Sequence, residues 1–151
     1  FMRIALEEAR LAFKAGEVPV GAILADQKRG IVVAAASNAV ESSNDATAHA
    51  EIVCMRRGAA LRGNWRLSGL TLYVTLEPCP MCAAAIRAFR VDRIVYGASS
   101  ERLGAINGLM RPVQKHPFHE ALEAEGGVLA DECAQLLQTF FRGRRGGGGT
   151  P

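Results

Sequence analysis

The sequence predicts one α/β domain in which helices pack against a single sheet. Segments with helical spacing of apolar residues alternate along the chain with short runs rich in β-branched residues, as in domains built around one sheet. The chain has 151 residues, 49% of them hydrophobic, which is enough to bury one sizeable core. We expect the domain to cover residues 1–145 and the glycine-rich tail, 146–151, to be disordered.

A helix and a hairpin are predicted at the start of the chain. Apolar side chains recur at helical spacing over residues 2–15 until Gly16 interrupts the pattern, which predicts a helix. Two apolar runs, 18–25 and 31–36, flank the polar turn "DQKRG" and predict a β-hairpin.

A second helix is expected to begin within the motif "DATAHAEI", residues 45–52, and to end near Leu61, with Thr47 as its cap. The run "TLYVTL", residues 71–76, is rich in β-branched and aromatic side chains and predicts a buried strand. A short helix is then expected to begin at Pro80, because proline is well tolerated at the first helical position.

The last third of the chain is less regular. Residues 93–97 predict a strand, and residues 98–117 contain two glycines without a clear period, which predicts a long loop. The pattern of residues 120–129 fits either a helix or a strand. A final helix is predicted over residues 130–142, with leucine and phenylalanine side chains on its inner face.

Positive charge is unevenly distributed along the chain. The net charge is only +3, but ten basic and three acidic residues lie between Arg56 and Lys115, and Arg142, Arg144 and Arg145 follow the last apolar segment. A solvated surface and a polyanionic partner both fit this pattern. No apolar run is long enough to span a bilayer, so a soluble protein with no membrane partner is expected.

Four cysteines, two of them in "CPMC", do not fit a secreted disulfide scaffold, so a reducing compartment is expected. Cys79 and Cys82 lie at or within a first helical turn, where free N–H groups and the helix dipole favour thiolates. His49 and Glu51 also lie at a helix start, two residues and therefore about 200° apart. They can share one site only if the helix points its N-terminal end at that site.

Together these residues predict a catalytic zinc site. His49, Cys79 and Cys82 provide three ligands and leave a fourth position for water, and Glu51 is then a proton carrier and not a ligand.

Two structural alternatives are weaker. A redox dithiol would have no use for His49 and Glu51. A structural zinc site would need a fourth protein ligand, and the candidates, Cys54 and Cys133, lie among apolar neighbours in predicted helices and are expected in the core.

The two motifs form the signature H-x-E…P-C-x-x-C of zinc nucleobase deaminases. In that reaction water attacks the ring carbon that bears the amino group. Glu51 would take a proton from the water and return protons to the ring nitrogen and to the leaving ammonia. The signature predicts the reaction class but leaves the base open.

Over nearly its whole length the chain resembles the tRNA-specific adenosine deaminases, which form inosine at the wobble position. The matching segments are "EVPVGAIL", "TAHAEI", "NWRL", "TLYVTLEPCPMCA", "RIVYGA" and "GVLADECAQLLQTFFRGRR". The last segment is the most specific, because free-base and nucleoside deaminases share the zinc motifs but not this ending. "HPFH", residues 116–119, resembles plastid members of plants and algae.

The resemblance implies a three-layer α/β/α, cytidine-deaminase-like fold with a five-stranded mixed sheet, and it assigns residues 121–125 to the last strand. It further implies one Zn²⁺ per subunit, a homodimer with active sites near the interface, and a tRNA anticodon stem-loop as substrate. The implied compartment is the plastid stroma for a plant or algal protein, with any transit peptide upstream of this chain, and otherwise the bacterial cytoplasm.

The same resemblance assigns Asn38 and Ala50 to substrate binding, and Phe141, Arg142 and Arg145 to contacts with the RNA. For these last three residues a solvated, cationic helix end is an equally good interpretation.

The chain departs from bacterial members of the family in two loops. Ala46 replaces a proline, and "SSERLGA", residues 99–105, replaces a stretch with an Arg-Asp pair and a lysine. Both loops resemble substrate-facing ones, so these differences bear on RNA preference.

Two other functions stay open. A guanine, cytosine or cytidine deaminase acting on free bases or nucleosides would share the zinc motifs, although the basic surface and the C-terminal ending argue against it. A non-catalytic zinc-dependent RNA-binding accessory subunit would have no use for Glu51 beside its metal.

Overall fold

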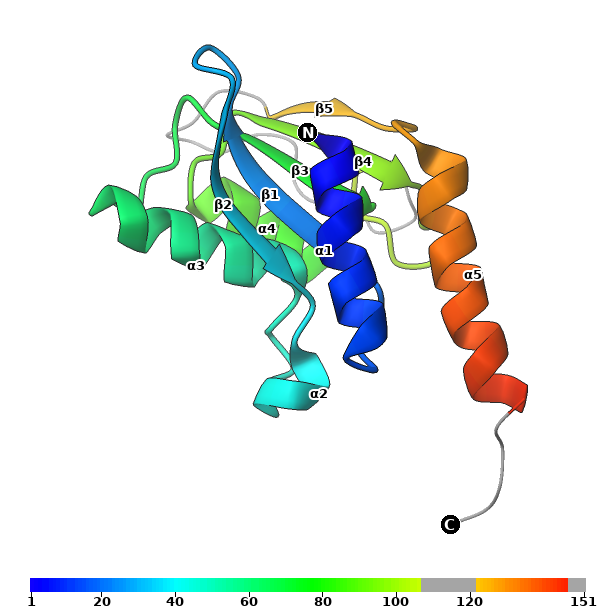
Figure 1. Cartoon of the computed structure of the whole chain (residues 1–151). Coiled ribbons are helices and arrows are strands. Elements are labelled where there is room, and N and C mark those ends of the chain that lie inside the picture. Colours follow the sequence, from blue (N-terminus) through cyan, green and yellow to red (C-terminus); the bar gives the residue numbers. More distant parts are fainter. Residues whose placement is uncertain (107–121, 147–151) are drawn as a thin grey trace.

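In a computed structural model of the chain, helices cover both faces of one five-stranded sheet (Figure 1). The structure describes residues 1–106 and 122–146, with side chains described up to residue 144. The strands are β1 (Gly21–Asp26), β2 (Ile31–Ser37), β3 (Thr71–Leu76), β4 (Arg93–Ala98) and β5 (Glu123–Glu125). The helices are α1 (Met2–Lys14), α2 (Val40–Ser43), α3 (Ala50–Arg62), α4 (Pro80–Ala88) and α5 (Ala130–Gly146).

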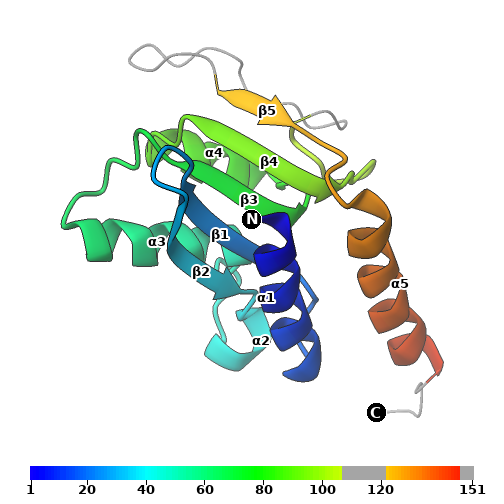
Figure 2. The same cartoon turned by 45° about the horizontal axis from the view of Figure 1, so that its top comes forward.

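The sheet is mixed, with the strand order β2-β1-β3-β4-β5. β1 runs antiparallel to both of its neighbours, whereas β3, β4 and β5 are parallel to one another. Helices α1 and α5 cover one face, and α3 and α4 cover the other (Figure 2). The predicted three-layer α/β/α architecture with a five-stranded mixed sheet is therefore confirmed. None of the described helices is long and apolar enough to cross a membrane.

Alternating side chains of the central strands fill two cores. Leu24 and Val74 point toward α3 and α4, where Met55 is fully buried. Their neighbours Ile23 and Tyr73 belong to the second core, under α1 and α5. A strand buried on both faces reads as a continuous apolar run, which is why β1 and β3 are recognisable in the sequence.

Several predicted boundaries shift for local reasons. β1 begins at Gly21 and not at residue 18, because Pro19 lacks an N–H group and the Val20 N–H donates to the Val18 carbonyl (2.8 Å). The predicted polar stretch before α3 contains a four-residue helix, α2, which the sequence pattern does not predict.

The ambiguous segment before α5 contains a strand, as the resemblance implies. β5 spans Glu123–Glu125 and pairs with β4 in parallel. Residue 121 lies outside the described residues, as do the second half of the predicted loop 98–117 and the segment 116–119. α5 ends at Gly146, four residues beyond the predicted end, and residues 147–151 are not described, so the domain boundary at 145 and the disordered tail stay predictions.

The first helix lies unusually close to the sheet at Gly21. A Cβ atom at this position would lie 2.1 Å from the Ala5 carbonyl oxygen and 2.4 Å from the Ala9 nitrogen. Both atoms belong to the backbone of α1, so the helix as a whole would have to move to accommodate a side chain.

Gly21→Ala is therefore expected to lower the free energy of unfolding by about 1–3 kcal/mol or more, measured by chemical denaturation. Gly143→Ala is the matched control, because a Cβ there meets no atom within 4 Å and Gly143 lies in α5. That control should leave stability unchanged or raise it by up to about 1 kcal/mol. Equal stabilities for the two variants would contradict the close packing of α1 on β1.

Candidate active site

Four chain segments meet at one edge of the sheet. β3 and β4 are parallel, so their carboxyl ends lie at the same edge, and the antiparallel arrangement brings the start of β1 and the end of β2 there as well. A cavity of about 310 Å³ opens at this edge. Its lining residues are Glu17, Val18, Val20, Asn38, Val40, Glu41, His49, Glu51, Leu76, Glu77, Cys79, Ser100, Leu103 and Arg144.

Two helices begin at this edge, and unusual residues occupy their N-caps. His49 precedes α3 and Cys79 precedes α4, and both have extended backbone conformations. N-caps are usually Ser, Thr, Asp or Asn, whose side chains accept a hydrogen bond from the helix. Neither His49 nor Cys79 makes such a bond. Their side chains point toward each other instead.

The three predicted zinc ligands come together. The His49 Nδ1 atom lies 3.4 Å from Cys82 Sγ and 3.7 Å from Cys79 Sγ, and all three ligand atoms lie within 4.8 Å of one another. In a tetrahedral zinc site with Zn–S of about 2.3 Å and Zn–N of about 2.0 Å, a nitrogen and a sulfur ligand are about 3.5 Å apart. The two measured N···S distances bracket this value, so the donor set fits one zinc ion.

The other two cysteines lie elsewhere, as expected. Cys54 belongs to the core under α3 and Cys133 to the core under α5. Burial raises the pKa of the Cys54 thiol to about 12 and that of the Cys133 thiol to about 11. Among the described residues, therefore, neither of these cysteines can be the fourth protein ligand that a structural zinc site would need.

The thiols of the two predicted cysteine ligands have pKa values shifted in opposite directions. A hydrogen bond with Cys82 lowers the pKa of Cys79 to about 4, and the same contact raises the pKa of Cys82. A hydrogen bond with Cys79 raises the pKa of His49. Because the thiolate is the form that binds metal, the low pKa of Cys79 favours metal binding by this group of three residues.

Glu51 lines the cavity beside these ligands. It lies in the first turn of α3 and is 4% exposed, and burial raises the pKa of its carboxyl group. Glu51 thus lies beside the three predicted metal ligands without belonging to their group. This is the arrangement that the sequence predicts for a proton carrier.

The predicted substrate residues are placed differently. Asn38 follows β2, is 7% exposed and lines the cavity. Ala50 is fully buried, and among the described residues its neighbours His49 and Glu51 line the cavity while Ala50 does not. A contact between Ala50 and a substrate stays a prediction.

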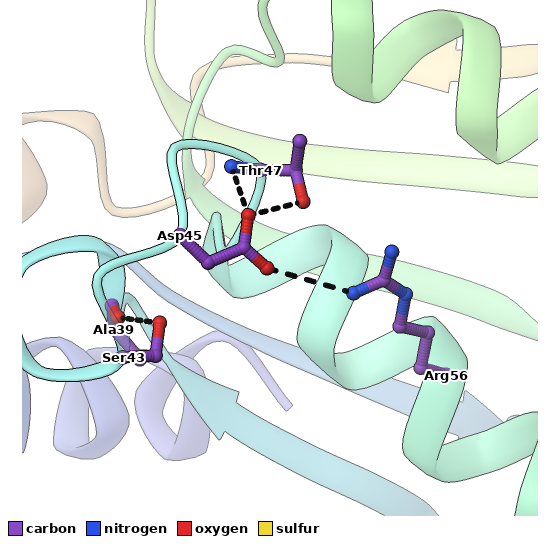
Figure 3. Close-up of polar contacts among 5 residues, drawn as sticks. All are labelled: Ala39, Ser43, Asp45, Thr47 and Arg56. Atoms are coloured by element: carbon purple, nitrogen blue, oxygen red, sulfur yellow. Dashed lines mark hydrogen bonds and ion pairs between the residues drawn. The ribbon is translucent and has the colours of Figure 1, made fainter.

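The turn before His49 is organised by Asp45 (Figure 3). The Thr47 N–H and hydroxyl both donate to Asp45 Oδ1, at 2.8 and 2.7 Å, and the Arg56 guanidinium lies 3.9 Å from Oδ2. The Ser43 hydroxyl closes α2 by donating to the Ala39 carbonyl. The prediction that Thr47 caps α3 is therefore wrong. The N-cap of α3 is His49, two residues after Thr47, and the Thr47 hydroxyl donates to Asp45 and not to the helix.

The C-terminal helix reaches the cavity through Arg144, which the sequence does not assign to the site. Arg144 lines the cavity, donates to the Gly16 carbonyl (2.6 Å) and lies over the Phe140 ring at 4.7 Å. Phe141 and Arg142 are exposed, and the side chain of Arg145 lies outside the described residues. Arg144 was recognisable in principle, because it follows the inward-facing Phe140 by four residues and so shares its helix face.

Glu77 is a second functional candidate missed in the sequence. It is 3% exposed, and its carboxylate accepts the backbone N–H groups of Ser100 (2.9 Å) and Ile106 (3.1 Å). A Cβ at Gly104 would lie 2.3 Å from the same carboxylate. The divergent loop at 99–105 thus wraps around Glu77, which places Ser100 and Leu103 in the cavity wall.

Comparison with known proteins agrees with this site. The cytidine and deoxycytidylate deaminase zinc-binding region matches residues 1–98. The tRNA-specific adenosine deaminase of Haemophilus influenzae is 48% identical over 144 residues, which cover 95% of this chain and 83% of that protein. The chain belongs to the tRNA-specific adenosine deaminase family.

A chloroplastic tRNA(adenine(34)) deaminase of Arabidopsis thaliana is 45% identical over 158 residues, and the match covers 94% of this chain but only 12% of that protein. A structure from studies of A-to-I editing by tRNA:A34 deaminases superposes with a TM-score of 0.85 and 43% identity, covering 91% of this chain and 98% of the other. A guanine deaminase from Nitrosomonas europaea has a TM-score of 0.78 and 26% identity, covering 92% and 81%. The shared fold alone therefore does not determine which nucleobase is deaminated.

Cys82→Ala is expected to abolish stoichiometric zinc binding, because two protein ligands remain where three are needed. Zinc content per subunit, measured by elemental analysis after dialysis, tests this. Cys54→Ala provides the control: it removes a buried thiol outside the site and should keep one zinc per subunit. Full zinc content in Cys82→Ala would remove this residue from the ligand set.

Proposed function

We propose that this chain hydrolyses adenosine to inosine at the wobble position of a tRNA anticodon, with one zinc ion per subunit. The observation that carries the proposal is the meeting of His49, Cys79, Cys82 and Glu51 at one cavity, in a chain of this family.

The residues divide the work of the reaction. A zinc ion held by His49, Cys79 and Cys82 would lower the pKa of a bound water to about 7 and so would supply a nucleophile at neutral pH. Glu51 accepts the proton of that water and delivers protons to the ring nitrogen and to the amino group. A C–O bond forms at the ring carbon, the C–N bond breaks, and ammonia leaves.

The cavity limits how the substrate enters. Its volume of about 310 Å³ lies at the lower end of the roughly 300–1,000 Å³ of small-molecule sites, so one nucleobase fits and a stacked segment does not. The wobble base must therefore leave the anticodon stack. Val18, Val20 and Leu76 offer apolar surface to the ring, while Asn38 provides a polar contact. Ala50 would approach the nucleoside through its backbone.

The surroundings of the cavity suit a nucleic-acid partner. The exposed Phe141 and Arg142 lie on the helix whose Arg144 lines the cavity, and Arg145 follows in the same turn. These residues would contact the anticodon stem-loop. We further propose a homodimer, and the plastid stroma as the compartment if the protein comes from a plant or alga.

The substrate class is decided by a direct comparison of substrates. An anticodon stem-loop with a wobble adenosine should yield inosine, whereas free adenosine, guanine, cytosine and cytidine should release ammonia far more slowly. Faster turnover of a free base or nucleoside would favour the rival deaminase. Absence of turnover with zinc fully bound would favour the accessory subunit.

Glu51→Ala is expected to keep the fold and the zinc content but to lower the rate of inosine formation by at least about 100-fold, as for loss of a general acid–base. Single-turnover kinetics with saturating enzyme measure this rate. Glu7→Ala, on the exposed face of α1, is the control and should match the wild type. A rate near the wild-type value in Glu51→Ala would remove Glu51 from proton transfer.

A further inference from the structure

Glu17 is a buried acid that the proposed chemistry does not use. It lies in the turn between α1 and β1, is 1% exposed and lines the cavity. Its carboxylate accepts three N–H groups: Asn38 Nδ2 at 3.1 Å, the Glu41 backbone at 3.2 Å and the Ser42 backbone at 2.7 Å. Although burial alone raises the pKa of Glu17, these hydrogen bonds, led by Ser42, lower it below its usual value, so the group is ionised at neutral pH.

An ionised carboxylate fixes which way the Asn38 amide faces. Since a carboxylate only accepts hydrogen bonds, the atom of Asn38 that meets it must be the Nδ2 donor. The Oδ1 atom is then the group that Asn38 can present to a molecule in the cavity. A neutral partner such as a hydroxyl would allow either orientation, because it both donates and accepts.

The same carboxylate also fixes the wall beside Asn38. The N–H groups of Glu41 and Ser42 belong to the first turn of α2, where no carbonyl of that helix can accept them. Asn38, Val40 and Glu41 all line the cavity. One side chain thus holds the amide and the adjoining wall in a single arrangement.

We propose that Glu17 is a positioning residue, which orients Asn38 so that Oδ1 accepts a hydrogen bond from an N–H or O–H group of the bound nucleoside. The inference rests on the proposed function. It makes Glu17 a determinant of substrate recognition that acts through Asn38 and not through zinc.

An exchange of donor and acceptor tests this assignment. In Asn38→Asp, two carboxylates face each other and no donor lies between them. In Glu17→Gln, the new NH₂ group faces N–H donors that need an acceptor. Each single change should lower kcat/KM for the stem-loop by about 10- to 100-fold, the usual cost of unpaired buried polar groups. In the double variant, the new amide at position 17 donates to the new carboxylate at position 38. The second oxygen of that carboxylate still faces the cavity as an acceptor.

Glu17→Gln/Asn38→Asp should therefore recover kcat/KM to within about 10-fold of the wild type, because only the Glu41 N–H lacks its acceptor. In an Asn38→Ala background, Glu17→Gln should lower kcat/KM by no more than about the same 10-fold, because there too only the Glu41 N–H lacks its acceptor. If the losses of kcat/KM caused by the two single changes multiply in either combination, Glu17 acts independently of Asn38 and the assignment is overturned. Glu8→Gln is the matched control, since Glu8 accepts from Ser37, next to Asn38, but does not line the cavity.

A readout without turnover separates this inference from the proposed function. The Asn38 side-chain amide signals in the ¹⁵N–¹H spectrum of the zinc-bound protein, assigned by their loss in Asn38→Asp, should be protected from solvent exchange and should shift in Glu17→Gln. Unprotected signals that do not shift would overturn the assignment even if the stem-loop is deaminated. Protected signals in a protein that forms no inosine would uphold the orientation of Asn38 while the proposed function fails.

Discussion

The rest of the structure depends on one constraint: the N-termini of helices α3 and α4 must lie next to each other. α3 and α4 approach the same edge of the sheet, and their N-cap residues, His49 and Cys79, are two of the three predicted zinc ligands. A ligand at an N-cap is positioned by the backbone of its helix, so small shifts of either helix change the ligand geometry directly. The close packing of both helices on the central strands therefore supports the chemistry as well as stability.

The mixed sheet explains why this edge gathers the site. Because β1 is antiparallel to both of its neighbours, the segment before β1 lies beside the segments that follow β2, β3 and β4. Each segment contributes one wall of the cavity. Two buried glutamates then hold these walls through backbone N–H groups: Glu17 binds α2, and Glu77 binds the loop after β4. Buried carboxylates are tolerated here because N–H donors surround them.

The sequence predicts those parts of the site that depend on local spacing. His49, Glu51, Cys79 and Cys82 lie in two short motifs whose helical positions follow from composition, and the structure brings these residues together. Residues whose roles depend on distant partners were missed. Nothing near Glu17 in the chain indicates that its carboxylate meets residues 38–42, and Glu77 meets the loop after β4 across more than twenty residues.

The central claim is that zinc is held by one histidine and two cysteines, with one position left for water. X-ray absorption at the zinc edge of the loaded protein tests it most directly. The structure predicts two sulfur ligands at about 2.3 Å and two nitrogen or oxygen ligands at about 2.0 Å. A shell of three or four sulfur atoms would draw in Cys54 or Cys133 and contradict the account.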